Sequence, residues 1–112
     1  MTFDAFDVVI VPFPLTDRAT AKRRPAVVLS HADFNAATGH IIAAMITSAR
    51  QSTWASDMPL TDIAAAGLPT ACVVRMKLFT LDTALVIRKA GQLGNADATA
   101  VKSVLGGVIP SL

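Results

Sequence analysis

Short runs of aliphatic and β-branched residues, each ended by proline, glycine or polar residues, recur along the chain and limit what it can fold into. These runs predict strands at residues 7–13, 25–29, 40–46, 71–78 and 84–88. Several short strands spaced about 8 to 12 residues apart are typical of a small antiparallel barrel or curled sheet. Because proline cannot donate to a strand ladder, Pro12 predicts that the far end of the first strand lies at an edge or a bulge.

The last part of the chain has a helical pattern instead. Asn95 or Asp97 can cap a helix there, before a stripe of apolar residues at spacings of three and four. The stripe consists of Ala98, Val101, Leu105 and Val108. A β-rich α+β fold with a C-terminal helix follows from this pattern. No internal repeat or flexible linker divides the sequence, so we expect one domain over residues 1–112.

Two shorter helical turns are predicted between the strands. Ser30 and Asp33 have the spacing of a capping box, with Asp in place of the usual Glu, ahead of a turn that ends at Gly39. Thr61 can cap a second turn over residues 61–66, with Gly67 after it.

Composition excludes several classes of protein. Hydrophobic residues make up 53% of the chain and charged residues 16%, which is the opposite of a disordered composition. The longest stretch without charge, residues 34–49, is broken by polar residues and falls short of the roughly 20 apolar residues that a membrane span needs. The acidic start of the sequence does not resemble a signal peptide, and the single Cys72 leaves no intrachain disulfide to form. We therefore expect a cytoplasmic protein without a membrane segment.

Positive charge is concentrated in one stretch. The chain has ten Lys and Arg against eight acids, all Asp, and four of the ten cations are Arg18, Lys22, Arg23 and Arg24. Arg24 stands at the start of a predicted strand, which would hold it rigidly, and a planar guanidinium can bind phosphate oxygens. The other three can follow the backbone of a single nucleic-acid strand, or can belong to a solvated loop.

A second candidate feature is the pair Thr47-Ser48 at the end of the third predicted strand. These hydroxyls either donate to a phosphate or cap the turn that follows. Nucleotide-binding glycine loops and serine-hydrolase or zinc-protease motifs are absent, and His31 and His40 lack the spacing of a metal site. We expect neither a metal nor another cofactor.

Six stretches occur in an order and spacing that resembles the MazF/PemK family of toxins from type II toxin–antitoxin modules, over roughly residues 6–94. They are DVVIVPF at 7–13, RPAVVLS at 24–30, ITS at 46–48, AGL at 66–68, VVR at 73–75 and TLD at 80–82. The resemblance implies an SH3-like barrel, a homodimer, a cognate antitoxin with an acidic, partly disordered tail, and metal-independent, sequence-specific cleavage of single-stranded RNA, chiefly messenger RNA. The family's catalytic Arg and Thr fall on Arg24 and Thr47, and Ser48 and Arg75 match further residues of the PemK branch.

The sequence departs from the family pattern at three places. Phe6 stands where the family usually has Gly, which puts the opening turn in question. Met76 and Lys77 stand where many members carry an acid or Gln that faces the site. Gln92 replaces a basic residue.

The residues leave several roles open. The general base for RNA cleavage is Asp17, His31, His40 or an oxygen of the phosphate itself, because free Arg is a poor base near pH 7. Trp54 is the best candidate for stacking on a base, and otherwise packs over the core or against a partner. Arg75 and Lys77 share one face of a strand, where they border the RNA groove or are solvated edge charges.

Two other functions are compatible with the same fold. One is a toxin that poisons DNA gyrase by binding, as the CcdB toxins do. The other is a non-catalytic SH3-like module that binds RNA or a partner and regulates its own operon.

Overall fold

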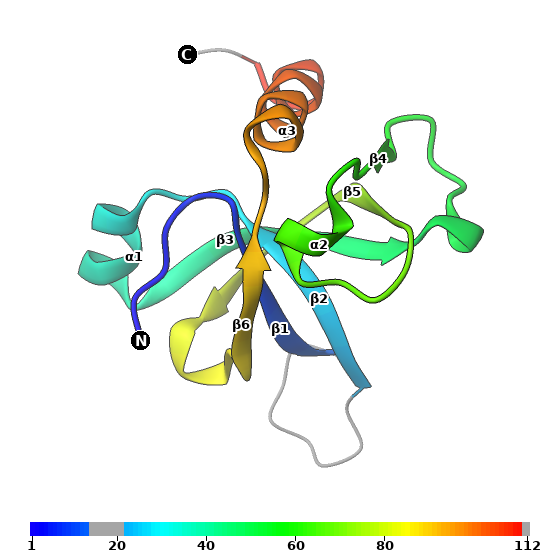
Figure 1. Ribbon diagram of the computed structural model, residues 1–112. Helices are drawn as coiled ribbons and strands as arrows, with labels where there is room; N and C mark the ends of the chain where they lie inside the picture. Colours follow the sequence, from blue (N-terminus) through cyan, green and yellow to red (C-terminus); the bar gives the residue numbers. More distant parts are fainter. Residues whose placement is uncertain (14–21, 111–112) are drawn as a thin grey trace.

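A curled six-stranded antiparallel sheet is the centre of the fold (Figure 1). The computed structural model describes residues 1–13 and 22–110. The strands are β1 (Asp7–Phe13), β2 (Lys22–Val28), β3 (His40–Ser48), β4 (Met58–Pro59), β5 (Cys72–Asp82) and β6 (Arg88–Gln92), in the sheet order β4-β5-β3-β2-β1-β6. The helices are α1 (Ala32–Thr38), α2 (Ile63–Ala66) and α3 (Asn95–Val108), with single 3₁₀ turns η1 (Ala49–Gln51) and η2 (Thr83–Leu85). The expected β-rich α+β fold, a small antiparallel barrel with a C-terminal helix, is confirmed.

Both faces of the central strands are buried, which is why their sequences are almost continuously apolar. One cluster of buried side chains lies under α2 and α3 and includes Val27, Ile46 and Val74. The second cluster, on the opposite face, includes Val28 and Ile41. Neighbouring residues of a strand therefore enter different clusters, as the alternation of a β-strand requires. None of the helices in the described part of the chain is long and apolar enough to cross a membrane.

Several sequence predictions need correction. No strand covers residues 84–88: residues 83–85 form η2, because the Asp82 carboxylate accepts a hydrogen bond from the Ala84 amide at 2.9 Å, and β6 begins only at Arg88. The capping box at Ser30 is also wrong. The Ser30 hydroxyl bonds to Asn35 and to the Ile42 amide instead. Thr61 does not cap α2 either: the helix begins after Asp62, whose carboxylate accepts a hydrogen bond from the Ala65 amide at 3.0 Å.

Two other predictions at the element ends are confirmed at least in part. Pro12 pairs with Arg23 on β2. On the other side of β1, β6 pairs only with residues 7–10, so Pro12 has no described strand partner there and lies at the open edge that its sequence predicts. The C-terminal helix is present and buries Val101, although Val108 at its end is 46% exposed. Its predicted cap is wrong, because the helix begins after Gly94 without a side-chain cap, and Asn95 and Asp97 lie within its first turn.

Two glycines explain the tight crossing of α2 over β6. Gly67 ends α2 in the left-handed conformation, at φ 71°, and a Cβ there would collide with the Ala90 carbonyl. A Cβ on Gly91 would collide with the Ala65 carbonyl in the same way. Only residues without a side chain allow these two backbones to meet.

Phe6 occupies the one left-handed position that a residue other than glycine holds in the described chain, with φ at 73°. Its amide donates to the Val28 carbonyl at 2.6 Å and its carbonyl accepts from the Leu93 amide at 2.9 Å, so backbone bonds on two sides fix this conformation. The ring packs against the first core cluster and lies 5.3 Å from the Lys102 ammonium. Phe6 therefore accepts backbone strain at a position suited to glycine, and its ring contacts offset that strain.

Asp97 is a buried carboxylate that attaches α3 to the loop before α2. It is 2% exposed and accepts hydrogen bonds from the Thr61 amide, the Thr61 hydroxyl and the Asp62 amide at 2.8–3.1 Å. Burial favours the neutral acid, but these hydrogen bonds outweigh it and hold the pKa of Asp97 below its ordinary value. The charged form is therefore the one that the fold stabilises.

The strain at Phe6 predicts an unusual order of stability. Phe6→Ala loses the ring and keeps the strain, whereas Phe6→Gly loses the ring and relieves it. We expect Phe6→Gly to be the more stable of the two by about 1 kcal/mol in urea unfolding. The control is Ala36, in the middle of α1, where Gly in place of Ala should instead lower the free energy of unfolding by about 1 kcal/mol. A Phe6→Gly variant less stable than Phe6→Ala would contradict the strain.

Replacing Asp97 by Asn should destabilise the fold by about 2 kcal/mol at pH 7, because one carboxylate receives all of these hydrogen bonds. A carboxylate with a lowered pKa contributes stability above its unfolded pKa, near 4, and loses it as the pH falls through the folded value. The difference between wild type and Asp97→Asn should therefore be constant from pH 7 to about 5 and shrink below 4. Urea unfolding at several pH values measures it, and a constant difference down to pH 2 would exclude an ionised Asp97 as the cause.

Candidate functional site

A hollow of about 170 Å³ opens where β2 begins and β3 ends, at the end of the sheet that also receives Phe13 from β1. It combines cations, a hydroxyl, an amide and apolar side chains. The residues that line it are Phe13, Arg24, Met45, Ile46, Thr47, Gln51, Arg75 and Lys77. Four of the twelve candidate site residues that the sequence indicates therefore meet in one place: Arg24, Thr47, Arg75 and Lys77.

Strand register brings these residues together. On β2 and β3, Ala26 is paired with Met45, and continuing that antiparallel register by two residues sets Arg24 across from Thr47. On β3 and β5, Met45 is paired with Arg75. Residues two apart on a strand share a face, so Arg24, Thr47 and Arg75 are held on one face by three neighbouring strands.

A bulge in β5 adds Lys77 to this face. Ala44 pairs with Leu78 while its neighbour Met45 pairs with Arg75, so Met76 and Lys77 have no opposite partners on β3. Met76 is buried in the first core cluster, and Lys77 is exposed at the hollow. Of the two departures from the family pattern here, only Lys77 changes the chemistry of the hollow, and it adds a positive charge. Bulges commonly re-aim a side chain next to a functional site.

Two of the cations lie close to the ring of Phe13. The Arg24 guanidinium is 5.9 Å from the centre of that ring and the Lys77 ammonium is 5.4 Å from it. The negative face of an aromatic ring attracts cations at such distances. Phe13 therefore helps to hold two like charges close together.

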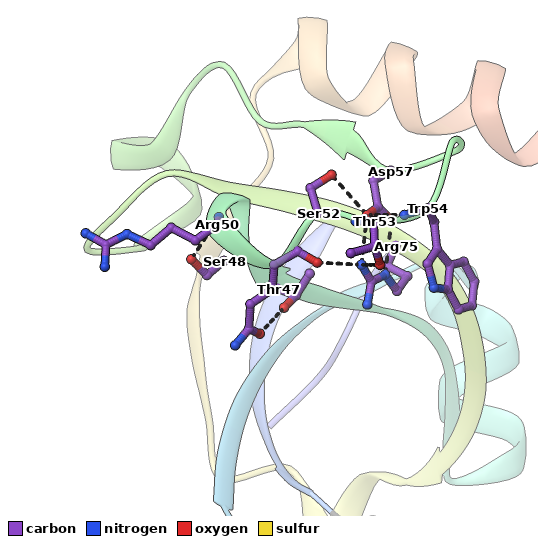
Figure 2. A network of polar contacts seen from close by, with 9 residues as sticks. Thr47, Ser48, Arg50, Ser52, Thr53, Trp54, Asp57 and Arg75 are labelled. Atoms are coloured by element: carbon purple, nitrogen blue, oxygen red, sulfur yellow. Dashed lines mark hydrogen bonds and ion pairs between the residues drawn. The ribbon is translucent and has the colours of Figure 1, made fainter.

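The third cation, Arg75, is paired with a buried carboxylate (Figure 2). Its Nε donates to Oδ1 of Asp57 at 3.1 Å and its Nη2 donates to Oδ2 at 2.8 Å. Nη2 also donates to the Gln51 carbonyl at 3.0 Å and to the Thr53 hydroxyl at 3.3 Å. The Asp57 side chain is 1% exposed and that of Arg75 is 17% exposed, so the pair is largely shielded from water.

Asp57 also organises the segment before it, residues 49–57, which we call the wall segment. Its Oδ2 accepts hydrogen bonds from the Ser52 hydroxyl and from the Thr53 and Trp54 amides at 3.1–3.2 Å. The hydrogen bonds from Arg75, with smaller contributions from the Trp54 amide and the Ser52 hydroxyl, lower the pKa of Asp57 to about 2 against the opposing effect of burial. Asp57 is therefore a carboxylate at any physiological pH.

Trp54 covers the Arg75 guanidinium. The centre of its ring system lies 5.0 Å from Cζ of Arg75, and the residue is 44% exposed (Figure 2). It is not among the residues that line the hollow, but it stands beside one that is. Its exposed surface is available to stack on a base.

The two hydroxyls at the end of β3 have different surroundings. Thr47 lines the hollow, and its Oγ1 donates to Oε1 of Gln51 at 3.2 Å. The Ser48 hydroxyl accepts from the Arg50 amide at 3.3 Å and caps η1, and Ser48 lines a separate depression with Arg50. Of the two readings of this pair, the structure favours capping for Ser48.

The remaining candidates among the described residues do not line the hollow. Lys22 and Arg23 are exposed at the start of β2 and do not line the hollow. His31 and His40 are exposed on either side of α1, and neither lines it. Asp17 and Arg18 lie outside the described residues. Within residues 1–13 and 22–110, no group of three or more His, Cys or Asp side chains could hold a metal ion.

Three residues of the site carry no role from the sequence: Phe13, Gln51 and Asp57. Gln51 follows Thr47 by four positions across a turn, a spacing that brings side chains together only if the turn is helical. Asp57 ends a polar loop with three hydroxyl residues, Ser52, Thr53 and Ser56, which is a signal for local capping, but nothing in that pattern indicates a partner on β5.

Comparison with known proteins identifies the family. The chain matches a family model described as a PemK-like, MazF-like toxin of a type II toxin–antitoxin system over residues 4–109. MazF (Form-I) from Deinococcus radiodurans has a similar structure, with a TM-score of 0.75 and 25% identity over 96% of each chain. In the MazE-MazF complex (Form-II) from the same organism, the matching chain has a TM-score of 0.76 and 24% identity, and the match covers 100% of this chain and 99% of that one. An endoribonuclease from a mycobacterial species, solved in complex with its cognate antitoxin, has a TM-score of 0.74 and 14% identity, and the match covers 99% of this chain and 98% of that one. No match was found among curated proteins.

The last two of these structures are similar in fold alone, whereas the family model covers nearly the whole chain. The stretches that form the hollow, RPAVVLS, ITS and VVR, fall within its match. The chain belongs to the PemK-like, MazF-like toxin family of type II toxin–antitoxin systems.

Proposed function

We propose that this toxin is a sequence-specific endoribonuclease that cleaves single-stranded RNA, chiefly messenger RNA, at the hollow. The observation that carries the proposal is the meeting of Arg24, Thr47 and Lys77 on one rigid face, beside Arg75. Fixed cations and a hydroxyl suit the phosphate at which such a reaction occurs, because its charge grows in the transition state. The family membership supports the same activity.

The chemistry is attack by a ribose 2′-hydroxyl on the neighbouring phosphorus. The bond from the 2′-oxygen to phosphorus forms as the bond to the 5′-oxygen of the next nucleotide breaks. The 2′-hydroxyl loses its proton and the departing 5′-oxygen gains one, so the products are a 2′,3′-cyclic phosphate and a 5′-hydroxyl. No metal takes part in these steps.

Arg24 is the group best placed to stabilise the transition state. It is fixed by β2 and by the Phe13 ring, and a guanidinium can donate two hydrogen bonds to the phosphate oxygens. Thr47 can turn its hydroxyl from Gln51 to the phosphate, at the cost of one exposed hydrogen bond. Lys77 adds a second positive charge beside the same ring.

The described residues that line the hollow leave fewer candidates for the general base than the sequence alone does. His31 and His40 do not line the hollow, and the Asp57 carboxylate is occupied by Arg75 and the wall segment. Among the described residues, no free carboxylate or imidazole lines the hollow. We propose that the base is an oxygen of the substrate phosphate or Asp17; Asp17 lies outside the described residues.

The rest of the RNA strand would follow the surface around the hollow. Trp54 and Phe13 offer aromatic faces on which bases can stack, and Lys22 and Arg23 offer charge to the backbone. We also propose that the chain acts as a homodimer and is inhibited by a cognate antitoxin. An acidic, disordered tail of that antitoxin would compete with RNA for the cations of the hollow.

The proposal predicts that Arg24→Ala lowers the rate of RNA cleavage by about 10²-fold or more, because the variant loses a donor to the transition state. The matched control is Arg88→Ala, which removes the same charge from an exposed position on β6 that does not line the hollow and should retain activity within a few-fold. Each protein is incubated with a long single-stranded RNA in EDTA, and the cleaved ends are mapped. Cuts at a short motif with 5′-hydroxyl ends, lost only in Arg24→Ala, are expected.

Full activity in Arg24→Ala would remove the hollow as the site. RNA that is bound but not cut by the wild type would favour a non-catalytic module, an alternative that the absence of a free acid or base among the described lining residues supports. A protein that neither binds nor cuts RNA would be tested next on supercoiled DNA with gyrase.

A further inference from the structure

We propose that Asp57 is a positioning residue of this site, which fixes Arg75 and the wall segment so that one nitrogen of the Arg75 guanidinium serves the hollow. The inference rests on the proposed RNA cleavage for its effect on rate, but its effect on binding can be measured without cleavage. It concerns a residue outside the family's recognised stretches: Asp57 lies between ITS and AGL.

The hydrogen bonds of Arg75 fix its orientation. Nε and Nη2 both face Asp57, and Nη2 has two further acceptors in the wall segment, the Gln51 carbonyl and the Thr53 hydroxyl. No described residue accepts a hydrogen bond from Nη1, the third nitrogen of the guanidinium. Arg75 is also one of the residues that line the hollow. We infer that Nη1 is the donor that a phosphate or base in the hollow would meet.

Asp57 fixes both partners of this arrangement at once. The same carboxylate that holds Arg75 accepts from the Thr53 and Trp54 amides and the Ser52 hydroxyl. The Trp54 ring lies over the same guanidinium (Figure 2). Without the Asp57 carboxylate, neither the Arg75 guanidinium nor the Trp54 ring would be held in its position.

The ion pair also changes what Arg75 contributes. Its charge is cancelled locally by Asp57, so the net attraction of the hollow for a polyanion comes from Arg24 and Lys77. Arg75 contributes an oriented hydrogen-bond donor rather than net charge. Removal of the Asp57 charge should therefore have opposite effects on the two stages of the reaction: RNA binds more tightly, and it is cleaved more slowly.

The test is Asp57→Asn, compared with Asp33→Asn, which makes the same charge change at an exposed position on α1. Binding is measured with a single-stranded DNA of the cleaved sequence, or of mixed sequence if no cut is found, since it lacks the attacking 2′-hydroxyl. We expect tighter binding by Asp57→Asn, with a salt dependence of log K steeper by about 0.7. We expect kcat to fall about 10- to 100-fold, because a small displacement of a donor has effects of that size. Asp33→Asn should leave kcat unchanged.

A double-mutant cycle separates positioning from a general loss of structure. In an Arg75→Ala background, adding Asp57→Asn should lower kcat no further if Asp57 acts through Arg75. An additional fall of 10-fold or more would overturn the proposal. So would weaker binding by Asp57→Asn, or a kcat within two-fold of wild type.

Arg75→Lys tests the same geometry if Asp57→Asn does not fold by circular dichroism. It keeps the charge but cannot reach both carboxylate oxygens as a guanidinium does. We expect unchanged binding and a kcat lowered at least 10-fold, and an unchanged kcat would overturn the proposal. If the wild type cleaves no RNA, the proposed function fails by itself. The binding and salt measurements then still decide whether Asp57 cancels the charge of Arg75.

Discussion

The hydrogen-bonded ladder between β3 and β5 is the interaction on which the rest of the structure depends. It pairs every residue of β3, from His40 to Ser48, with a residue of β5. Each face of this ladder contributes to a different apolar cluster, so a slip by one residue would turn the side chains of each cluster to the opposite face and disrupt the packing of both. The ladder is interrupted only at Ala44/Met45, and that interruption lies beside the hollow. A strongly specified register and a bulge beside the hollow therefore occur in the same pair of strands.

The charges around the hollow are managed in two ways. Arg24 and Lys77 approach the ring of Phe13, which attracts them without cancelling their charge. Arg75 is instead neutralised by a buried carboxylate that is itself satisfied by the wall segment. Three like charges around about 170 Å³ would otherwise repel one another strongly. Arg24 and Lys77 therefore keep the charge that would attract a polyanion, whereas Arg75 is available to orient it.

The sequence predicts most of the sheet and about half of the site, for physical reasons. Strands with both faces buried have an apolar pattern that is visible without a structure, as in residues 7–13. The strand proposed at 84–88 was wrong because a single carboxylate, Asp82, turns the chain into η2. The bulge in β5 has no local signal, since Met76 and Lys77 are compatible with a regular strand. Arg24 and Thr47 belong to recognisable stretches, whereas the contact of Asp57 with Arg75 spans 18 positions and depends on the register of β5.

Trp54 has a consequence for how this protein can be observed. It is the single tryptophan of the chain, and its indole lies over the guanidinium at the edge of the hollow while nearly half of it remains in contact with solvent. Its fluorescence therefore comes from the wall segment and from nowhere else in the molecule. An incoming nucleic acid, an antitoxin tail or a disturbed ion pair would each change the polarity around the same indole. The chain carries a native optical reporter at its site, and occupancy can be followed without attaching a label.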